Sequence, residues 1–254
     1  MERLHVGVFN GKFRQSLKGA NDKAAMGYIF NENQDDGTAY AANIAVGLKG
    51  SGINLDKTNC SDTSGTWTRF FTVTPDQTIN YMFAHDNLCY WDKIKKAGKT
   101  GDYAKRIVKF GHGILLVSQG IPFIHAGDEF LRTKEKGAGS SMSHNSYMAG
   151  TATNAIDWSL KATNSSVFKY HADLIALRKA HDGLRYRNGV GTTETKDNAV
   201  IYKVKDTDGT KLCIVVNPGN NINKPVSGTT IFDIHGATPT TSNCEGTAVT
   251  IIEY

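Results

Sequence analysis

Alternation of short apolar runs with helix-period segments is the feature that most constrains the fold of this chain. Apolar runs typical of buried strands occupy residues 4–9, 79–84 and 121–127. Residues 103–118 and 167–181 repeat apolar side chains at close to the 3.6-residue period of a helix with one buried face. Strands that alternate with helices in this way form βα units, so we expect a parallel sheet.

The pattern changes near Leu184, where helical segments give way to short strands and turns. Four strands are predicted in this region, at residues 199–205, 211–216, 229–233 and 249–254. Asp206-Thr207-Asp208-Gly209 separates the first two and predicts a β-hairpin. We therefore expect an α/β domain over residues 1–184, followed by a small antiparallel β-sandwich domain over residues 185–254.

Charge and hydropathy exclude two classes of partner. The net charge of +5 is spread along the chain. The only tight basic cluster consists of Lys93, Lys95, Lys96 and Lys99. Because this spacing is typical of a solvated helix face, we expect no nucleic-acid partner. No apolar segment is long enough to span a bilayer and no secretory signal follows Met1, so we expect no membrane partner; the location of the protein stays open.

The cysteines do not indicate a metal site. They are Cys60, Cys89, Cys213 and Cys244. None has the spacing of a zinc ligand, and no loop has the oxygen-ligand spacing of a calcium site, so we expect neither a metal nor a cofactor. Free thiols and one or two disulfides both remain possible readings of these residues.

The apolar run 79–84 ends directly at His85-Asp86-Asn87. In barrel enzymes, the polar residues that follow a buried strand form the active site. Trp91 adds aromatic surface close to this carboxylate, as sugar-binding clefts often do, although packing is the alternative role for its ring. Equally, Asp86 has an alternative structural role as the cap of the next helix.

Several segments, in their order and spacing, resemble the C-terminal part of type I pullulanases, starch-debranching glycoside hydrolases of the α-amylase superfamily. They include residues 75–94, 115–134, 144–147, 154–159 and 174–181. Asp92-Lys93 and Arg132-Thr133-Lys134 favour the pullulanase branch over the α-amylases.

The resemblance implies that residues 1–184 form strands six to eight of a (β/α)8 TIM barrel. It also implies a retaining mechanism, with Asp86 as the catalytic transition-state stabiliser and His85 binding the same sugar. Further substrate-binding residues implied by the resemblance are Asn145, Tyr147 and Asn154. Thr151 departs from the family, which usually has an Asp there, so affinity for the donor-side sugar is in doubt.

In the family, the nucleophile and the general acid end barrel strands four and five, which we expect to lie upstream of Met1. Two acidic pairs within the chain, Asp35-Asp36 and Asp128-Glu129, could in principle replace these carboxylates. The context of Asp35-Asp36 favours a solvated surface loop, and that of Asp128-Glu129 favours a role in bracing loops. We therefore expect part of a debranching enzyme for α-1,6 linkages in pullulan, starch or glycogen, whose partners are an α-glucan and the missing N-terminal barrel half. On its own the chain is predicted to be inactive. Calcium occurs in the superfamily. The alternatives are an α-1,4-acting amylase fragment and an inert glucan-binding remnant.

Overall fold

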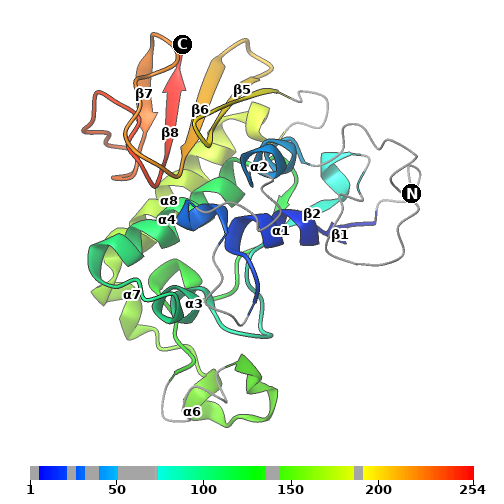
Figure 1. Cartoon of the computed structure of the whole chain (residues 1–254), viewed down its shortest axis with the longest axis vertical. Helices are drawn as coiled ribbons and strands as arrows, with labels where there is room; N and C mark the ends of the chain where they lie inside the picture. Colours follow the sequence, from blue (N-terminus) through cyan, green and yellow to red (C-terminus); the bar gives the residue numbers. More distant parts are fainter. Residues whose placement is uncertain are drawn as a thin grey trace.

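The computed structural model describes residues 6–21, 27–31, 40–50, 72, 74–135, 144–185 and 191–254. Figure 1 shows an antiparallel sheet at one end, long helices in the middle and a protrusion around α6 at the other end. Among the helices of these residues, none combines the length and apolar character that crossing a bilayer requires.

Three short strands form a parallel sheet in the order β1-β2-β3. Their bounds are Val8–Phe9, Thr78–Asn80 and Ile121–Pro122. The predicted parallel sheet is therefore confirmed, although each strand is shorter than its apolar run. The buried Asn80 side chain accepts from Asn10 Nδ2 at 2.9 Å and donates to the Gln119 carbonyl at 2.8 Å, which ties neighbouring segments together. Their assignment as barrel strands six to eight stays a prediction.

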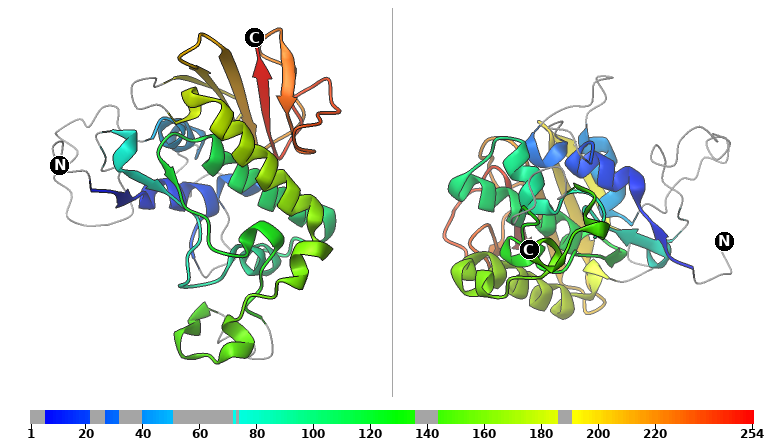
Figure 2. Two further views of the ribbon diagram at one scale, coloured as in Figure 1. Left: turned by 180° about the vertical axis from the view of Figure 1, so that it is seen from behind. Right: turned by 90° about the horizontal axis from the view of Figure 1, so that it is seen from below.

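Helices cover this sheet and extend beneath the antiparallel sheet (Figures 1 and 2). The α-helices are α1 (Gly11–Lys18), α2 (Tyr40–Leu48), α3 (Tyr90–Lys96), α4 (Gly101–Val117), α6 (Thr151–Asn154), α7 (Ser159–Thr163) and α8 (Ser165–Ala180). The 3-10 helices are η1 (Tyr28–Phe30), η3 (Pro75–Gln77), η4 (Asp128–Phe130), η5 (Ser146–Met148) and η6 (Asp182–Leu184). Helices α4 and α8, which pack side by side, confirm the two helices expected from the apolar period.

Two glycines of α4 lie where this helix approaches its neighbours. A Cβ at Gly111 would overlap the hydroxyl of Tyr90 in α3, and one at Gly113 would lie 2.6 Å from the hydroxyl oxygen of Tyr170 in α8. Glycine costs helix stability because its backbone loses more freedom on folding. Here the absence of a side chain at Gly111 and Gly113 lets the neighbouring helices pack closely against α4. Helix propensity alone does not predict this close packing.

The C-terminal region forms one five-stranded antiparallel sheet in the order β4-β5-β6-β8-β7. The strands are β4 (Thr192–Lys196), β5 (Ala199–Lys205), β6 (Lys211–Asn217), β7 (Thr229–Phe232) and β8 (Ala248–Glu253). The predicted hairpin is present, and Gly209 has a φ of +99° in its turn. Strand β4 was not predicted, because its sequence Thr-Thr-Glu-Thr-Lys is polar and most of its side chains are exposed.

The expected β-sandwich is wrong for the described residues, which contain a single antiparallel sheet. Helices α2 and α4 pack against this sheet, where a second sheet would lie in a sandwich. A smaller apolar cluster of the C-terminal region includes the buried side chains of Cys213, Cys244 and Ile252. Ile222 and Val226, from the segment between β6 and β7, pack against this cluster. Buried side chains from both predicted domains form one continuous cluster, and the boundary at residue 184 stays a prediction.

The cysteines of the described residues are free thiols. Cys89, Cys213 and Cys244 are all buried, and none is in a disulfide. Cys60 lies outside the described residues.

Candidate functional site

Asp86 lies on an exposed loop beyond the end of β2. The strand ends at Asn80, and residues 81–83 continue as buried irregular chain. The chain then emerges at His85 and Asp86, whose side chains are 86% and 70% exposed. His85 Nε2 lies 3.5 Å from Asp86 Oδ1, so the two side chains form one polar group. The helix-capping alternative is wrong, because the N-cap of α3 is Cys89 and no side chain caps that helix.

Lys134 fixes the backbone on both sides of Asp86. Lys134 is 1% exposed, and its ammonium donates to the carbonyl oxygens of His85 and Asn87, at 2.5 and 2.8 Å. Burial lowers the pKa of Lys134. Asn87 has a φ of +63°, a conformation in which Asn is among the favoured residues. The loop therefore presents the Asp86 carboxylate from a backbone held by a buried cation.

A buried carboxylate in α3 holds Lys134 and its neighbour. Asp92 accepts hydrogen bonds from the Thr133 hydroxyl at 2.5 Å and from the Lys134 backbone N–H at 2.8 Å. The Cys89 thiol also donates to Asp92, at 2.9 Å. The two runs that favoured the pullulanase branch are thus in direct contact, although 42 positions separate Asp92 from Lys134.

Arg132 connects the loop after β3 to the protrusion around α6. Its guanidinium lies 3.0 Å from His125 Nε2 and donates to the Asn154 carbonyl at 2.6 Å. The Asn154 side-chain amide donates to the carbonyls of Ser146 and Ala149, both at 2.8 Å. The Asn154 amide nitrogen therefore braces the segment between η5 and α6.

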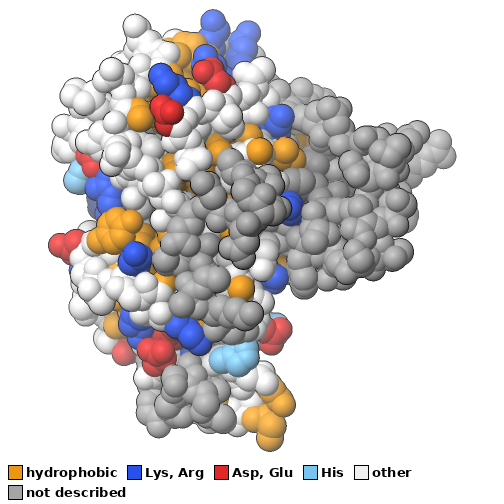
Figure 3. Space-filling model, viewed as in Figure 1, with side chains coloured by type: hydrophobic (Ala, Val, Ile, Leu, Met, Phe, Trp, Pro, Cys, Tyr) orange, Lys and Arg blue, Asp and Glu red, His pale blue; other side chains and the backbone are white. Residues whose placement is uncertain are grey.

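Asp86 borders two cavities. One, of about 280 Å³, is lined by His85, Asp86, His125, Arg132, Lys134, Ser146, Tyr147 and Asn154. The other, of about 370 Å³, includes Phe9, Arg14, Lys18, Tyr81 and Asp86 in its lining. Of the predicted substrate-binding residues, Tyr147 and Asn154 share the first cavity with the His85-Asp86 pair, whereas Asn145 does not line it. Figure 3 shows hydrophobic side chains at the tip of the protrusion, and the Tyr147 ring is 73% exposed.

The carboxylates at 128 and 129 brace the loop after β3. Asp128 is buried, accepts from the Tyr90 N–H at 3.4 Å and lies 3.6 Å from His125 Nδ1. Burial raises the pKa of Asp128. Glu129 accepts from the Gly127 N–H at 2.8 Å. Neither carboxylate lines the two cavities at Asp86, which agrees with the bracing interpretation; Asp35-Asp36 lies outside the described residues.

A buried histidine pair was not singled out from the sequence. His112 Nδ1 in α4 lies 2.7 Å from His171 Nε2 in α8, and His171 Nδ1 lies 2.7 Å from the Val167 carbonyl. Burial lowers the pKa of His112 and lowers that of His171 to about 4. The signal available in the sequence is that both histidines lie within apolar-period helices. Trp91 packs partly buried against the core, in line with its packing role.

The described part of the chain contains no cluster of three or more His, Cys, Asp or Glu side chains suited to a metal ion. The geometry therefore combines a presented carboxylate, a neighbouring imidazole, a buried arginine and an exposed tyrosine around one cavity. Such groups offer hydrogen bonds and ring contact to a polyhydroxylated ligand.

Comparisons with known proteins match several pullulanases and an isoamylase, although no family model matches. A pullulanase of Bacillus subtilis is 31% identical over 214 residues, which are 80% of this chain and 26% of that protein. The structure of pullulanase from Bacillus acidopullulyticus aligns with a TM-score of 0.78 and 27% identity over 98% of this chain and 30% of that chain. Pullulanase from Paenibacillus barengoltzii, in complex with maltohexaose and alpha-cyclodextrin, aligns with a TM-score of 0.75 and 28% identity over 97% of this chain and 38% of that chain. This chain thus spans between about a quarter and two fifths of the length of these relatives.

Proposed function

Because this chain is related to the type I pullulanases over most of its length, we propose that it forms part of a retaining glycoside hydrolase that debranches α-glucans at α-1,6 linkages. Pullulan, starch and glycogen carry such linkages and are the proposed substrates. The observation that carries the proposal is the cavity shared by Asp86, His85, Tyr147 and Asn154, in a fold that resembles the C-terminal region of pullulanases.

Asp86 is proposed to stabilise the transition state. A carboxylate next to the reacting sugar accepts hydrogen bonds from its hydroxyls and favours the oxocarbenium-like form. The Lys134 contacts to both neighbouring carbonyls support this role, since they restrain the loop before a ligand arrives. His85 is proposed to donate to the same sugar, with Tyr147 providing an exposed ring and Asn154 a carbonyl oxygen.

The nucleophile and general acid of a retaining enzyme lie about 5–5.5 Å apart. Within the described residues, Asp86 is the sole carboxylate that borders either cavity. This supports the proposal that the nucleophile and acid belong to polypeptide outside this chain, and that the chain alone does not turn over substrate. It also favours a second candidate function, glucan binding without hydrolysis.

The open face of the parallel sheet indicates where further polypeptide would dock. The rings of Phe9, Tyr81 and Phe123 contact one another, with centroids 4.9–6.3 Å apart. Phe9, Ile121 and Phe123 remain more than one third exposed. Parallel sheets are normally covered on both faces, so the proposed occupant is the remaining strands of the barrel.

The test is pullulan binding and hydrolysis by the purified 254-residue chain. We expect no release of reducing ends, and retarded migration in a pullulan-containing native gel that Asp86→Asn abolishes. Asp197→Asn is the matched control, since it removes an exposed carboxylate at a turn where φ is +48°, which Asn tolerates. Asp86-dependent hydrolysis would refute the proposed inactivity. Equal retardation of the Asp86→Asn variant would refute the assignment of Asp86.

A further inference from the structure

A second kind of cavity lies between the helices and the antiparallel sheet. It has a volume of about 430 Å³ and shares no lining residue with the two cavities at Asp86. Side chains from α4, the first turn of α8 and the turn after β7 line it, among them Tyr103, Lys105, Arg106, Lys109, Ser166 and His235. Its volume is in the range of about 300–1,000 Å³ that small-molecule sites occupy.

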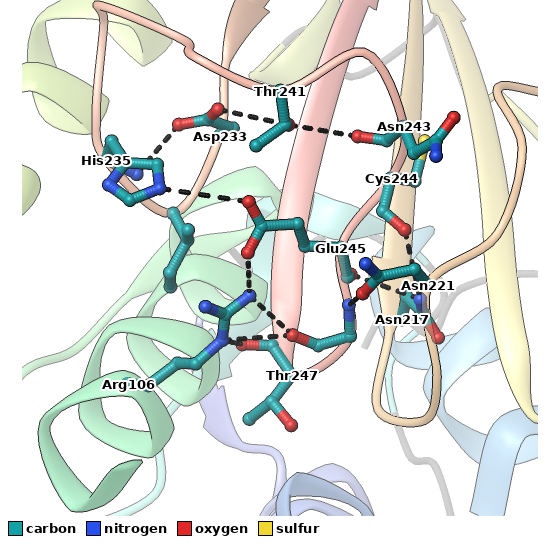
Figure 4. Close-up of polar contacts among 12 residues, drawn as sticks. Arg106, Asn217, Asn221, Asp233, His235, Thr241, Asn243, Cys244, Glu245 and Thr247 are labelled. Carbon is teal, nitrogen blue, oxygen red and sulfur yellow. Dashed lines mark hydrogen bonds and ion pairs between the residues drawn. The ribbon is translucent and has the colours of Figure 1, made fainter. Parts of the chain in front are cut away.

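Arg106 is already neutralised on the sheet side of this cavity. Figure 4 shows its guanidinium reaching from α4 to the segment before β8. It donates to Glu245 Oε2 at 2.5 Å and to the Gly246 carbonyl at 2.7 Å. His235 Nε2 lies 3.8 Å from the other oxygen of the same carboxylate. Glu245 therefore holds two basic groups at one wall and orients them.

The two lysines have weaker partners. Lys109 donates to the Ile234 carbonyl at 3.2 Å and lies 5.5 Å from the centre of the Tyr170 ring, without an ion pair to any carboxylate of the described residues. Burial and the neighbouring Arg106 lower its pKa. Lys105 lies 3.5 Å from Asp102, a fully exposed carboxylate, and such pairs contribute little in water. Asp102 also lines the cavity, and Asp102 and Asp233 attract Lys109 at longer range, so an incoming anion would meet two ammonium groups that are only partly neutralised.

We infer that this cavity binds a sugar phosphate monoester, with the phosphate between Lys105 and Lys109 and the sugar against Tyr103. The Tyr103 ring is 46% exposed beside the two cations and offers an apolar face to a sugar ring. Ser166, in the first turn of α8, adds a side-chain hydroxyl to the lining of the cavity. The choice of a sugar as the phosphate carrier rests on the proposed function.

Isothermal titration of the 254-residue chain tests this inference with three probes: glucose 6-phosphate, inorganic phosphate and maltotriose. We expect glucose 6-phosphate to bind most tightly, and its affinity to fall as ionic strength rises. Lys109→Gln and Lys105→Gln should each weaken binding about tenfold, as expected for loss of one charge-assisted hydrogen bond. Lys96→Gln, which removes an exposed charge from α3, is the matched control and should leave the affinity unchanged.

Absence of glucose 6-phosphate binding, or equal loss in the Lys96→Gln and Lys109→Gln variants, would overturn the inference. Equal affinity for inorganic phosphate would overturn the sugar assignment. Equal affinity for maltotriose, measured in the Asp86→Asn variant so that the proposed glucan site does not contribute, would overturn the phosphate assignment. Lys109 is half-buried, so its substitution could disturb folding. The Lys105→Gln variant therefore tests the same site independently. Because retardation in the pullulan gel depends on Asp86 and not on these lysines, failure here and failure of the proposed function are distinguishable.

Discussion

The carboxylate of Asp92 is expected to control both the stability of the chain and the geometry at Asp86. It is fully buried and accepts from the Thr133 hydroxyl and the Lys134 N–H. In an Asp92→Asn variant, one carboxylate oxygen becomes an NH₂ group that cannot accept, and the remaining oxygen loses its charge. Since a hydrogen bond to a charged group contributes about 1.5–3 kcal/mol, loss of one of these bonds and weakening of the other should lower the free energy of unfolding by about 3 kcal/mol.

The ion pair with Lys95 adds little to this value. Its ammonium lies 3.2 Å from Asp92, but its side chain is one third exposed and Glu135 is a second partner at 2.6 Å. Solvent screening therefore limits its contribution to below about 1 kcal/mol. Urea unfolding, followed by circular dichroism, measures the difference in the free energy of unfolding.

Asp102→Asn is the matched control for this prediction. Asp102 is fully exposed and lies 3.5 Å from Lys105, so its substitution should leave the unfolding midpoint almost unchanged. The Asp92→Asn variant should also lose retardation in the pullulan gel, because Lys134 would no longer be held beneath the loop of His85 and Asp86. A midpoint equal to that of the Asp102→Asn control would refute the reasoning.

Two further predictions concern the packing of α4. The folded-state pKa of His171, at about 4, lies below the ordinary 6.5 because of burial, so the unfolded chain binds protons more readily. The free energy of unfolding should therefore fall by up to about 3 kcal/mol as the pH drops from 6.5 to 4. This fall should be smaller in the His171→Gln variant, and equal pH dependence of the two free energies of unfolding would contradict the prediction. Gly111→Ala should destabilise by about 1–3 kcal/mol because its Cβ overlaps Tyr90, whereas Gly150→Ala, in open space, should cost little; equal melting temperatures would contradict the packing argument.

The sequence predicted those features of the site that depend on neighbouring residues, and not those that depend on contacts between distant residues. The position of Asp86 after an apolar run was visible because buried strand residues and exposed polar residues differ in hydropathy. Its support by Lys134 was not, because the contact joins residues 47 and 49 positions apart, from either side of Asp86. Asn154 likewise carries no local sign that its amide nitrogen already braces a turn.

By itself, the sequence determined helices α4 and α8, the hairpin of β5 and β6, and the parallel sheet of the first three strands. Hydrophobic period and turn residues act over a few neighbours and could therefore be read locally. Tertiary structure decided that helices rather than a second sheet cover the C-terminal strands, and that polar β4 joins their edge. It also decided that Gly111 and Gly113 mark close packing. These outcomes depend on which surfaces meet after folding, and the free energy of such contacts is shared by residues far apart in the chain.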